Sequence, residues 1–141
     1  MSFTPMRLPP GADLRRTLER HAVDHADGPA LFVVAGIGSL DGAVLRLAAA
    51  EQETRWTGPF EILSLSGSLS PQGAHLHMSV ADAKGRVWGG HVGYGNVVRT
   101  TVELVVAEMA GWRLGRAVDA GTGYLELTIR AENVGRQSSR H

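Results

Sequence analysis

The early part of the chain has one clear helical pattern of apolar and polar positions. Leu14, Leu18 and Ala22 recur at a spacing of four, and charged residues fill the positions between them. Asp13 directly precedes this pattern and can cap the first turn through its carboxylate. The pattern therefore predicts an amphipathic helix that begins after Asp13 and ends before Gly28 and Pro29.

Most of the remaining chain favours β-strands, because its apolar residues alternate or form short continuous runs. The run 31–37 is largely apolar, so we expect a strand that is buried on both faces. The run 82–85 has the composition of a hairpin turn. Further strands are expected at 43–48, 60–69, 74–80, 86–98 and 124–129.

The segment 100–109 permits two readings. Thr100 and Glu103 have the spacing of a capping box, which favours a helix. The same region is rich in valine and threonine, whose branched side chains favour a strand. We predict the strand.

Composition narrows the classes of function. The 141 residues suit a single domain, and the absence of cysteine excludes disulfides and thiolate metal sites. The 14 basic and 14 acidic residues balance, and Lys84 is the only lysine, whereas proteins that hold nucleic acid by electrostatics usually carry a basic excess. The N-terminus has no apolar run of signal-peptide or membrane-span length, so we expect a cytoplasmic protein without a membrane partner.

Three of the six histidines, His75, His77 and His91, fall within a short stretch of the chain. In a strand, side chains at i and i+2 point the same way, so His75 and His77 share one face. The hairpin at 82–85 would return His91 to them, and Gly89 and Gly90 would leave room for an ion. Three neutral imidazoles with one open position describe a catalytic type of zinc site, although nickel, copper and iron also accept imidazole. The alternative is three polar residues on a solvated sheet face.

Glu61 is the nearest candidate carboxylate and the only candidate catalytic residue. Strand alternation places Leu63 and Leu65 on its own face, among which a carboxylate usually needs a partner. It could accept a hydrogen bond from a ligand imidazole, act as a fourth ligand, or serve as a general base. The alternative is a surface glutamate, ion-paired for example with Arg46.

Several segments resemble the plants-and-prokaryotes conserved (PPC) domain. In order along the chain they read MRLPPGADLRRTLERHA, GIGSLDGAVLRLA, GPFEILSLSGSLS, GAHLHMSVADAKGRVWGGHV and TGYLEL. The resemblance implies an α+β domain at 1–130 with a central antiparallel sheet and flanking helices, assembled as a homotrimer, and a polar, mobile tail at 131–141. It also brings the DNA-binding label that bacterial members often carry. In plant relatives a separate arm with an Arg-Gly-Arg-Pro core binds the minor groove, and this chain has no such core.

Some prokaryotic members resemble metal-binding proteins whose ligands match His75, His77 and His91. The arrangement is also similar to the zinc site of acetolactate decarboxylase. Three hypotheses follow: a trimeric domain that holds a divalent metal, with or without catalysis of a small-molecule reaction; a DNA-binding transcriptional regulator; and an assembly module without chemistry.

Overall fold

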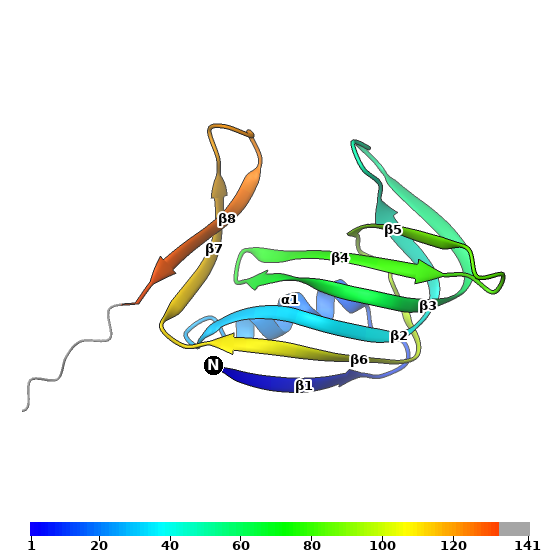
Figure 1. Cartoon of the computed structure of the whole chain (residues 1–141), viewed down its shortest axis with the longest axis horizontal. Coiled ribbons are helices and arrows are strands. Elements are labelled where there is room, and N and C mark those ends of the chain that lie inside the picture. Colours follow the sequence, from blue (N-terminus) through cyan, green and yellow to red (C-terminus); the bar gives the residue numbers. More distant parts are fainter. Residues whose placement is uncertain (133–141) are drawn as a thin grey trace, which may run out of the picture.

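The computed structural model describes residues 1–132 and consists mainly of one curled antiparallel sheet (Figure 1). Six strands pair in the order β1-β6-β2-β3-β4-β5, and β5 also pairs with β2. That additional pairing closes strands β2 to β5 into a ring, while β7 and β8 form a separate hairpin. The elements are β1 (Ser2–Leu8), α1 (Leu14–Asp24), β2 (Ala30–Arg46), β3 (Glu53–Ser70), β4 (Gly73–Ala81), β5 (Val87–Val92), β6 (Val98–Met109), β7 (Trp112–Val118) and β8 (Leu125–Ala131).

Helix α1 forms where the apolar spacing predicted it. The Asp13 carboxylate accepts a hydrogen bond of 3.0 Å from the Arg16 amide, so the N-cap is also confirmed. The helix ends at Asp24, a few residues before the glycine and proline that were expected to stop it. Within residues 1–132, no helix is both long and apolar enough to cross a membrane.

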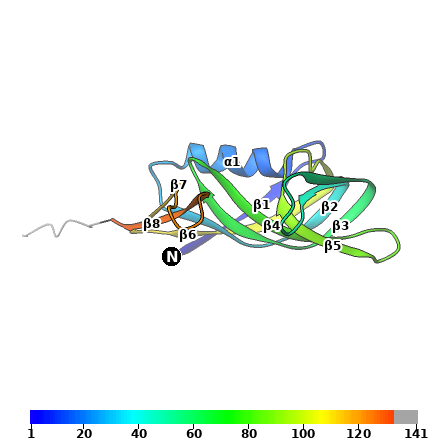
Figure 2. The same cartoon turned by 90° about the horizontal axis from the view of Figure 1, so that it is seen from above.

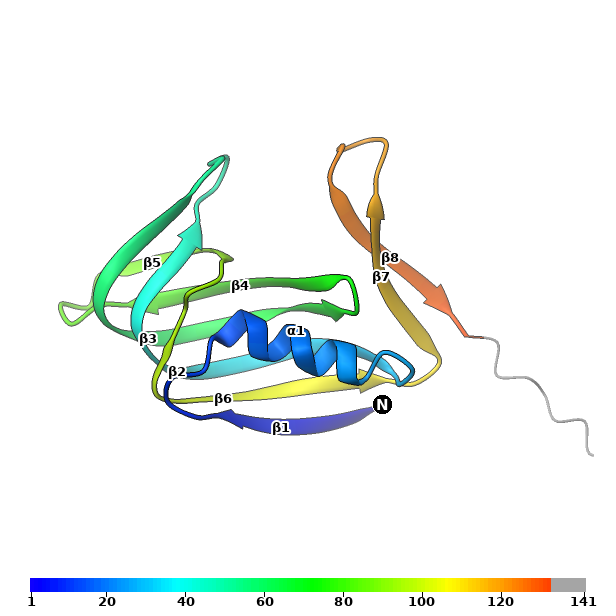
Figure 3. The same ribbon diagram turned by 180° about the vertical axis from the view of Figure 1, so that it is seen from behind.

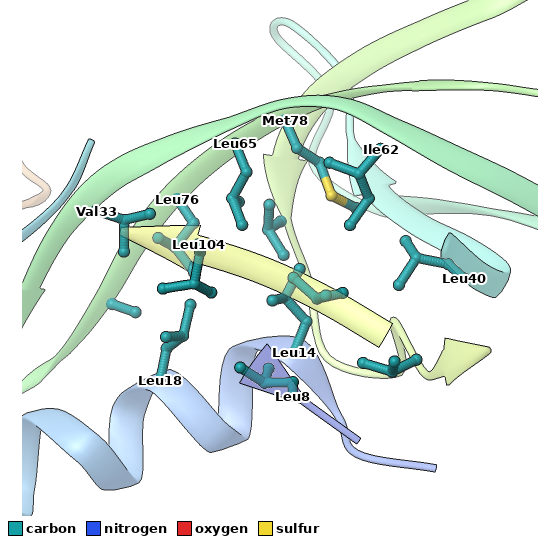
Figure 4. Close-up of a cluster of buried hydrophobic side chains, with 14 of the residues drawn as sticks. Leu8, Leu14, Leu18, Val33, Leu40, Ile62, Leu65, Leu76, Met78 and Leu104 are labelled. Atoms are coloured by element: carbon teal, nitrogen blue, oxygen red, sulfur yellow. The ribbon is translucent and has the colours of Figure 1, made fainter. Parts of the chain in front are cut away.

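The core lies between α1 and one face of the sheet (Figures 2 and 3). Leu14 and Leu18 of α1 are fully buried against side chains from the central strands, as the close-up in Figure 4 shows. Because successive strand residues point to opposite faces, every second residue of β4 enters this core. The buried β4 residues are Ala74, Leu76, Met78 and Val80.

The expected α+β class with flanking helices is wrong, because the chain is β-rich. The described residues form one helix, and it covers one face of a six-stranded antiparallel sheet. The physical reason is that 14–24 alone combines helical spacing with a cap, whereas the β-branched segment after Thr100 forms strand β6, as predicted.

Two strands were missed by the sequence patterns. Strand β1 contains Pro5, which argues against a central strand, but β1 lies at the sheet edge, where proline is tolerated. Within residues 1–132, strand β7 pairs with β8 alone, outside the main sheet, and its sequence lacks the strong apolar alternation of a core strand. The predicted tail at 131–141 begins inside β8, because Ala131 pairs with Trp112, and its part from residue 133 onward lies outside the described residues.

The expectation that 31–37 is buried on both faces is also wrong for the single chain. Val33 is fully buried, but Val34 and Ile37 are 50% and 56% exposed. The helix covers only one side of β2, and the other side of the sheet carries no second layer in the described chain (Figure 2).

Candidate metal centre

Strands β4 and β5 bring the three predicted histidines together. Leu76 and Met78 point into the core, so His75 and His77 project from the opposite face of β4. His91 of β5 lies directly across from His77 in the antiparallel ladder. Paired residues in such a ladder project to the same side, so all three imidazoles lie on the face away from α1.

The turn between β4 and β5 fixes this register. The Asp82 carboxylate accepts hydrogen bonds from the amides of Lys84 and Arg86, both at 2.9 Å, and from the Arg86 guanidinium at 2.8 Å. Gly85 has a φ of 77°, a left-handed conformation that favours glycine. The turn therefore holds β5 at one alignment on β4 and keeps His91 opposite His77.

The glycines before His91 have a different role from the one expected. A Cβ atom on Gly90 would lie 2.6 Å from the backbone oxygen of Arg46, so this glycine allows β2 to approach β5 closely. At Gly89 a Cβ atom would make only ordinary contacts. Gly90 thus serves the closure of the sheet rather than clearance for an ion, and Gly89 is not required for that closure.

The spacing of the imidazoles suits one small metal ion. One nitrogen from each ring can be chosen so that all three lie within 4.8 Å of one another. The Nε2 atoms of His75 and His77 are 3.2 Å apart, and the ring of His91 lies 5.1 Å from that of His75 between centroids. Two nitrogens bound tetrahedrally at zinc-like distances would be about 3.3–3.4 Å apart, so the His75–His77 pair already has the required separation.

The surroundings of His75 and His91 favour the neutral imidazole. Burial and, after it, the neighbouring His75 and arginine charges together lower the pKa of His91 to about 4. Burial, and next the Arg116 charge, also lower the pKa of His75. Neutral imidazole is the form that binds metals.

The polar atoms of the cluster also leave capacity for a ligand. The buried Nδ1 atom of His91 has no hydrogen-bond partner within the described part of the chain. A buried polar atom without a partner lowers the stability of the fold. A metal ion at the cluster could supply the missing interaction, either directly or through a contact that forms when the metal binds. The residues present therefore fit a metal ion.

Glu61 lies away from this cluster. It pairs with Ala81 at the far end of β4 from the histidines, its side chain is exposed, and it is not part of the group that could hold a metal. A β-bulge between Ile62 and Ser64 reverses the alternation of β3, so Leu65 is buried while Glu61 and Leu63 are exposed. The apolar surroundings expected for Glu61 from strict alternation are therefore absent.

One neighbour of the histidines gave no sequence signal. Arg116 of β7 donates a hydrogen bond of 2.5 Å to the Ser68 hydroxyl, and Ser68 lies directly across from His75 in the β3–β4 ladder. Glu126 of β8 also lies near enough for its charge to raise the pKa of His75. Both residues come from the β7–β8 hairpin, whose position against the sheet no local pattern predicts.

The sequence of this chain matches the model of a known protein family. Residues 1–110 match the model of the Plants and Prokaryotes Conserved (PCC) domain. This chain belongs to the PCC domain family. The match covers β1 to β6 and all three histidines, so the resemblance that the sequence motifs suggested is confirmed.

Solved structures of PCC-like proteins share the fold. A hypothetical protein from Salmonella enterica is 38% identical, with a TM-score of 0.86 over 92% of this chain and 94% of that one. A metal-containing protein from Archaeoglobus fulgidus is 27% identical, with a TM-score of 0.76 over 91% of this chain and 94% of its own. A protein from Ralstonia eutropha JMP134 named "putative DNA-binding protein" is 23% identical, with a TM-score of 0.74 over 88% of this chain and 89% of its own, and this likeness shows the fold alone.

A PCC-like segment also occurs within a longer relative. Bifunctional protein GlmU from Synechococcus sp. (strain JA-3-3Ab) is 49% identical over 125 residues. The match covers 89% of this chain but 20% of GlmU. The chain therefore spans about a fifth of that relative, and the activity of the whole protein is not carried over to it.

Proposed function

We propose that this PCC-domain protein binds one divalent metal ion per chain through His75, His77 and His91. The observation that carries the proposal is the convergence of one nitrogen from each of three imidazoles, all within 4.8 Å of one another, on one face of the β4–β5 hairpin. The lowered pKa values of His75 and His91 support it, because protons compete weakly for these nitrogens at neutral pH. The metal in the Archaeoglobus fulgidus relative supports it independently.

Zinc is the metal we propose. Three imidazole nitrogens without cysteine suit its tetrahedral preference, and they leave one position for water or a ligand. Such an open position is typical of catalytic zinc, which lowers the pKa of a bound water and polarises a carbonyl oxygen. This chemistry favours a role in a small-molecule reaction over a purely structural one. Glu61 has no part in the proposal. It lies in β3 opposite Ala81, at the end of β4 that is far from the histidines.

The test of metal binding is the metal content of protein purified without an affinity tag. We expect about one zinc ion per chain in the parent after zinc loading and desalting, and loss of that ion in His77→Ala. The matched control is His25→Ala, which removes an exposed histidine after α1 that is outside the cluster. A parent that retains no metal, or a His77→Ala variant that retains as much as the parent, would refute the proposal and leave the assembly module as the better reading.

We also propose that the chain assembles as a homotrimer. The face of the sheet that α1 does not cover carries exposed apolar side chains, and a second copy could bury them. These side chains are Phe32, Val34, Ile37 and Leu63. The family resemblance supports the threefold state, and sedimentation equilibrium tests it. We expect about three times the 15.0 kDa chain mass for the parent and a lower mass for Val34→Glu, while a monomeric parent at micromolar concentration would exclude assembly.

A further inference from the structure

Three arginines adjoin the proposed metal site. Arg46 lies directly across from His91 in the β2–β5 ladder, and Arg15 donates a hydrogen bond to the backbone oxygen of Val92, the residue after His91. Arg116 donates to the hydroxyl of Ser68, which lies directly across from His75. Among the charges that act on these two imidazoles, Glu126 is the one that acts in the opposite direction. A divalent ion added to this neighbourhood would raise the positive charge further, which favours an anionic ligand.

Two of the three arginines already use N–H groups in hydrogen bonds within the chain. The guanidinium of Arg15 donates to the Glu19 carboxylate at 2.9 Å and to the backbone oxygen of Val92 at 3.0 Å. Arg46 donates a long hydrogen bond of 3.4 Å to the backbone oxygen of Ala50. These contacts hold the two side chains against the protein and use some of their N–H groups.

Arg116 differs from them in its partners. Its one hydrogen bond within the described residues goes to the Ser68 hydroxyl, and none of the ion pairs formed within residues 1–132 includes it. Burial lowers the pKa of Arg116, and the charge of Glu126 opposes this shift without forming an ion pair with the guanidinium within residues 1–132. A partly desolvated guanidinium that uses one N–H group has further donors to offer a planar anion.

The sheet places this guanidinium beside the histidines. Phe32, Ser68 and His75 lie side by side across β2, β3 and β4 in the paired ladders. Cross-strand neighbours have Cβ atoms about 4.5–5.5 Å apart, so the group bonded to Ser68 adjoins the imidazole of His75. Arg116 lies beyond residues 1–110, the part matched to the PCC domain, so the family assignment says nothing about it.

We propose that the site takes a small carboxylate, with one oxygen on the metal bound by the three histidines and the other accepting from the Arg116 guanidinium. This inference rests on the proposed metal site. Carboxylate oxygen is an ordinary zinc ligand, and an N–H group of the guanidinium can donate a charge-assisted hydrogen bond to the second oxygen. The hydroxyls of Ser64 and Ser66 line the same exposed stretch of β3 and can bond to polar groups on the rest of the ligand.

The experiment uses the full chain loaded with Co²⁺ in place of Zn²⁺ and acetate as the probe. Cobalt absorbs visible light, and its spectrum changes when a ligand enters the coordination sphere, so binding is measured without any assumed activity. We expect a saturable spectral change in the parent and an acetate affinity about tenfold weaker or more in Arg116→Gln, because a charge-assisted hydrogen bond is lost. The matched control, Arg130→Gln, removes an exposed arginine from the same hairpin and should stay within about twofold of the parent.

Two further measurements separate the possible failures. Cobalt content and circular dichroism are recorded for every variant, so a parent that retains no cobalt refutes the metal site itself. If the parent and Arg116→Gln both retain cobalt and bind acetate equally well, the metal site stands and the role of Arg116 is wrong. If Arg116→Gln does not fold, Arg116→Met replaces it, because methionine fills similar space without a charge or a donor, and an affinity equal to that of the parent would also overturn the proposal. Phosphate is titrated in parallel, and a tighter, Arg116-dependent response to phosphate than to acetate would exclude a carboxylate as the preferred ligand.

Discussion

The sheet face that α1 covers and the face that it leaves open use the same strands but different side chains. On β4, Leu76 and Met78 are buried under α1, whereas His75 and His77 project from the open face. The open face also carries a hydrogen bond of 2.6 Å between the hydroxyls of Ser64 and Ser79 and an arginine from a distant hairpin. One face thus stabilises the fold and the other presents chemistry, and the packed face holds the histidines in place.

Substitutions at adjacent positions on β4 should give the largest difference in stability between the two faces. Leu76→Ala should lower the free energy of unfolding by about 2–5 kcal/mol, because it leaves a cavity in the core. In the presence of a chelator, His77→Ala should change it by about 0.5 kcal/mol or less, because that side chain is exposed. Urea unfolding of both variants measures the difference. Equal losses would mean that the open face contributes to stability as much as the core does.

Zinc binding should raise the free energy of unfolding, and the size of this increase should depend on the histidines of the open face. At a free zinc concentration one hundred times the dissociation constant, the parent should gain about 2.7 kcal/mol, and His77→Ala or His91→Ala should gain much less. Leu76→Ala should keep the gain, because its defect lies on the other face. Unfolding curves with zinc and with chelator provide the measurement, and a gain shared by the histidine variants would place the metal elsewhere.

Acid should weaken the metal-free fold by a smaller amount, through three partly buried histidines. Burial lowers the pKa values of His21, His75 and His91, so the unfolded chain binds more protons than the folded chain just below pH 6.5. Stability therefore falls as the pH drops from about 6.5 toward 4, the pKa of His91. The urea midpoint of the chelated parent should fall over this range, and His91→Gln should flatten the decline. A midpoint that stays constant between pH 7 and pH 5 would contradict these shifts.

Binding to DNA should be the weakest of the effects considered. With zero net charge and one lysine, the chain offers little counterion release, so we expect no appreciable affinity for duplex DNA at about 150 mM salt. The basic residues considered as contacts are Arg130, exposed on β8, and Arg136 and Arg140, which lie outside the described residues. A labelled-duplex titration that reached submicromolar affinity would favour the regulator hypothesis instead.

Short sequence patterns predicted the features that depend on interactions between residues close together in the chain. The spacing of Leu14, Leu18 and Ala22 located α1, and the i, i+2 rule placed His75 and His77 on one face. The pairing of His91 with His77 followed from a turn that the sequence marks at Asp82 and Gly85.

Features that depend on distant partners were not predictable in this way. The bulge after Ile62 breaks the alternation on which the expected surroundings of Glu61 depended. The closure of β5 on β2, and with it the need for glycine at position 90, is a contact between strands far apart in the chain. The approach of Arg116 to Ser68 is likewise set by how a whole hairpin packs, which no short window of sequence encodes.

The turn between β4 and β5 constrains length more strictly than residue type. Ala83 and Lys84 are exposed and can be exchanged without touching the histidines. Deleting one residue within β5 before His91 would instead shift the strand by one position, turning His91 toward α1 and Val92 toward solvent. Homologues that keep all three ligands should therefore differ between His77 and His91 by even numbers of residues, or carry a compensating bulge. An alignment of such homologues could use the parity of these gaps to separate chains that retain the cluster from chains that have lost it.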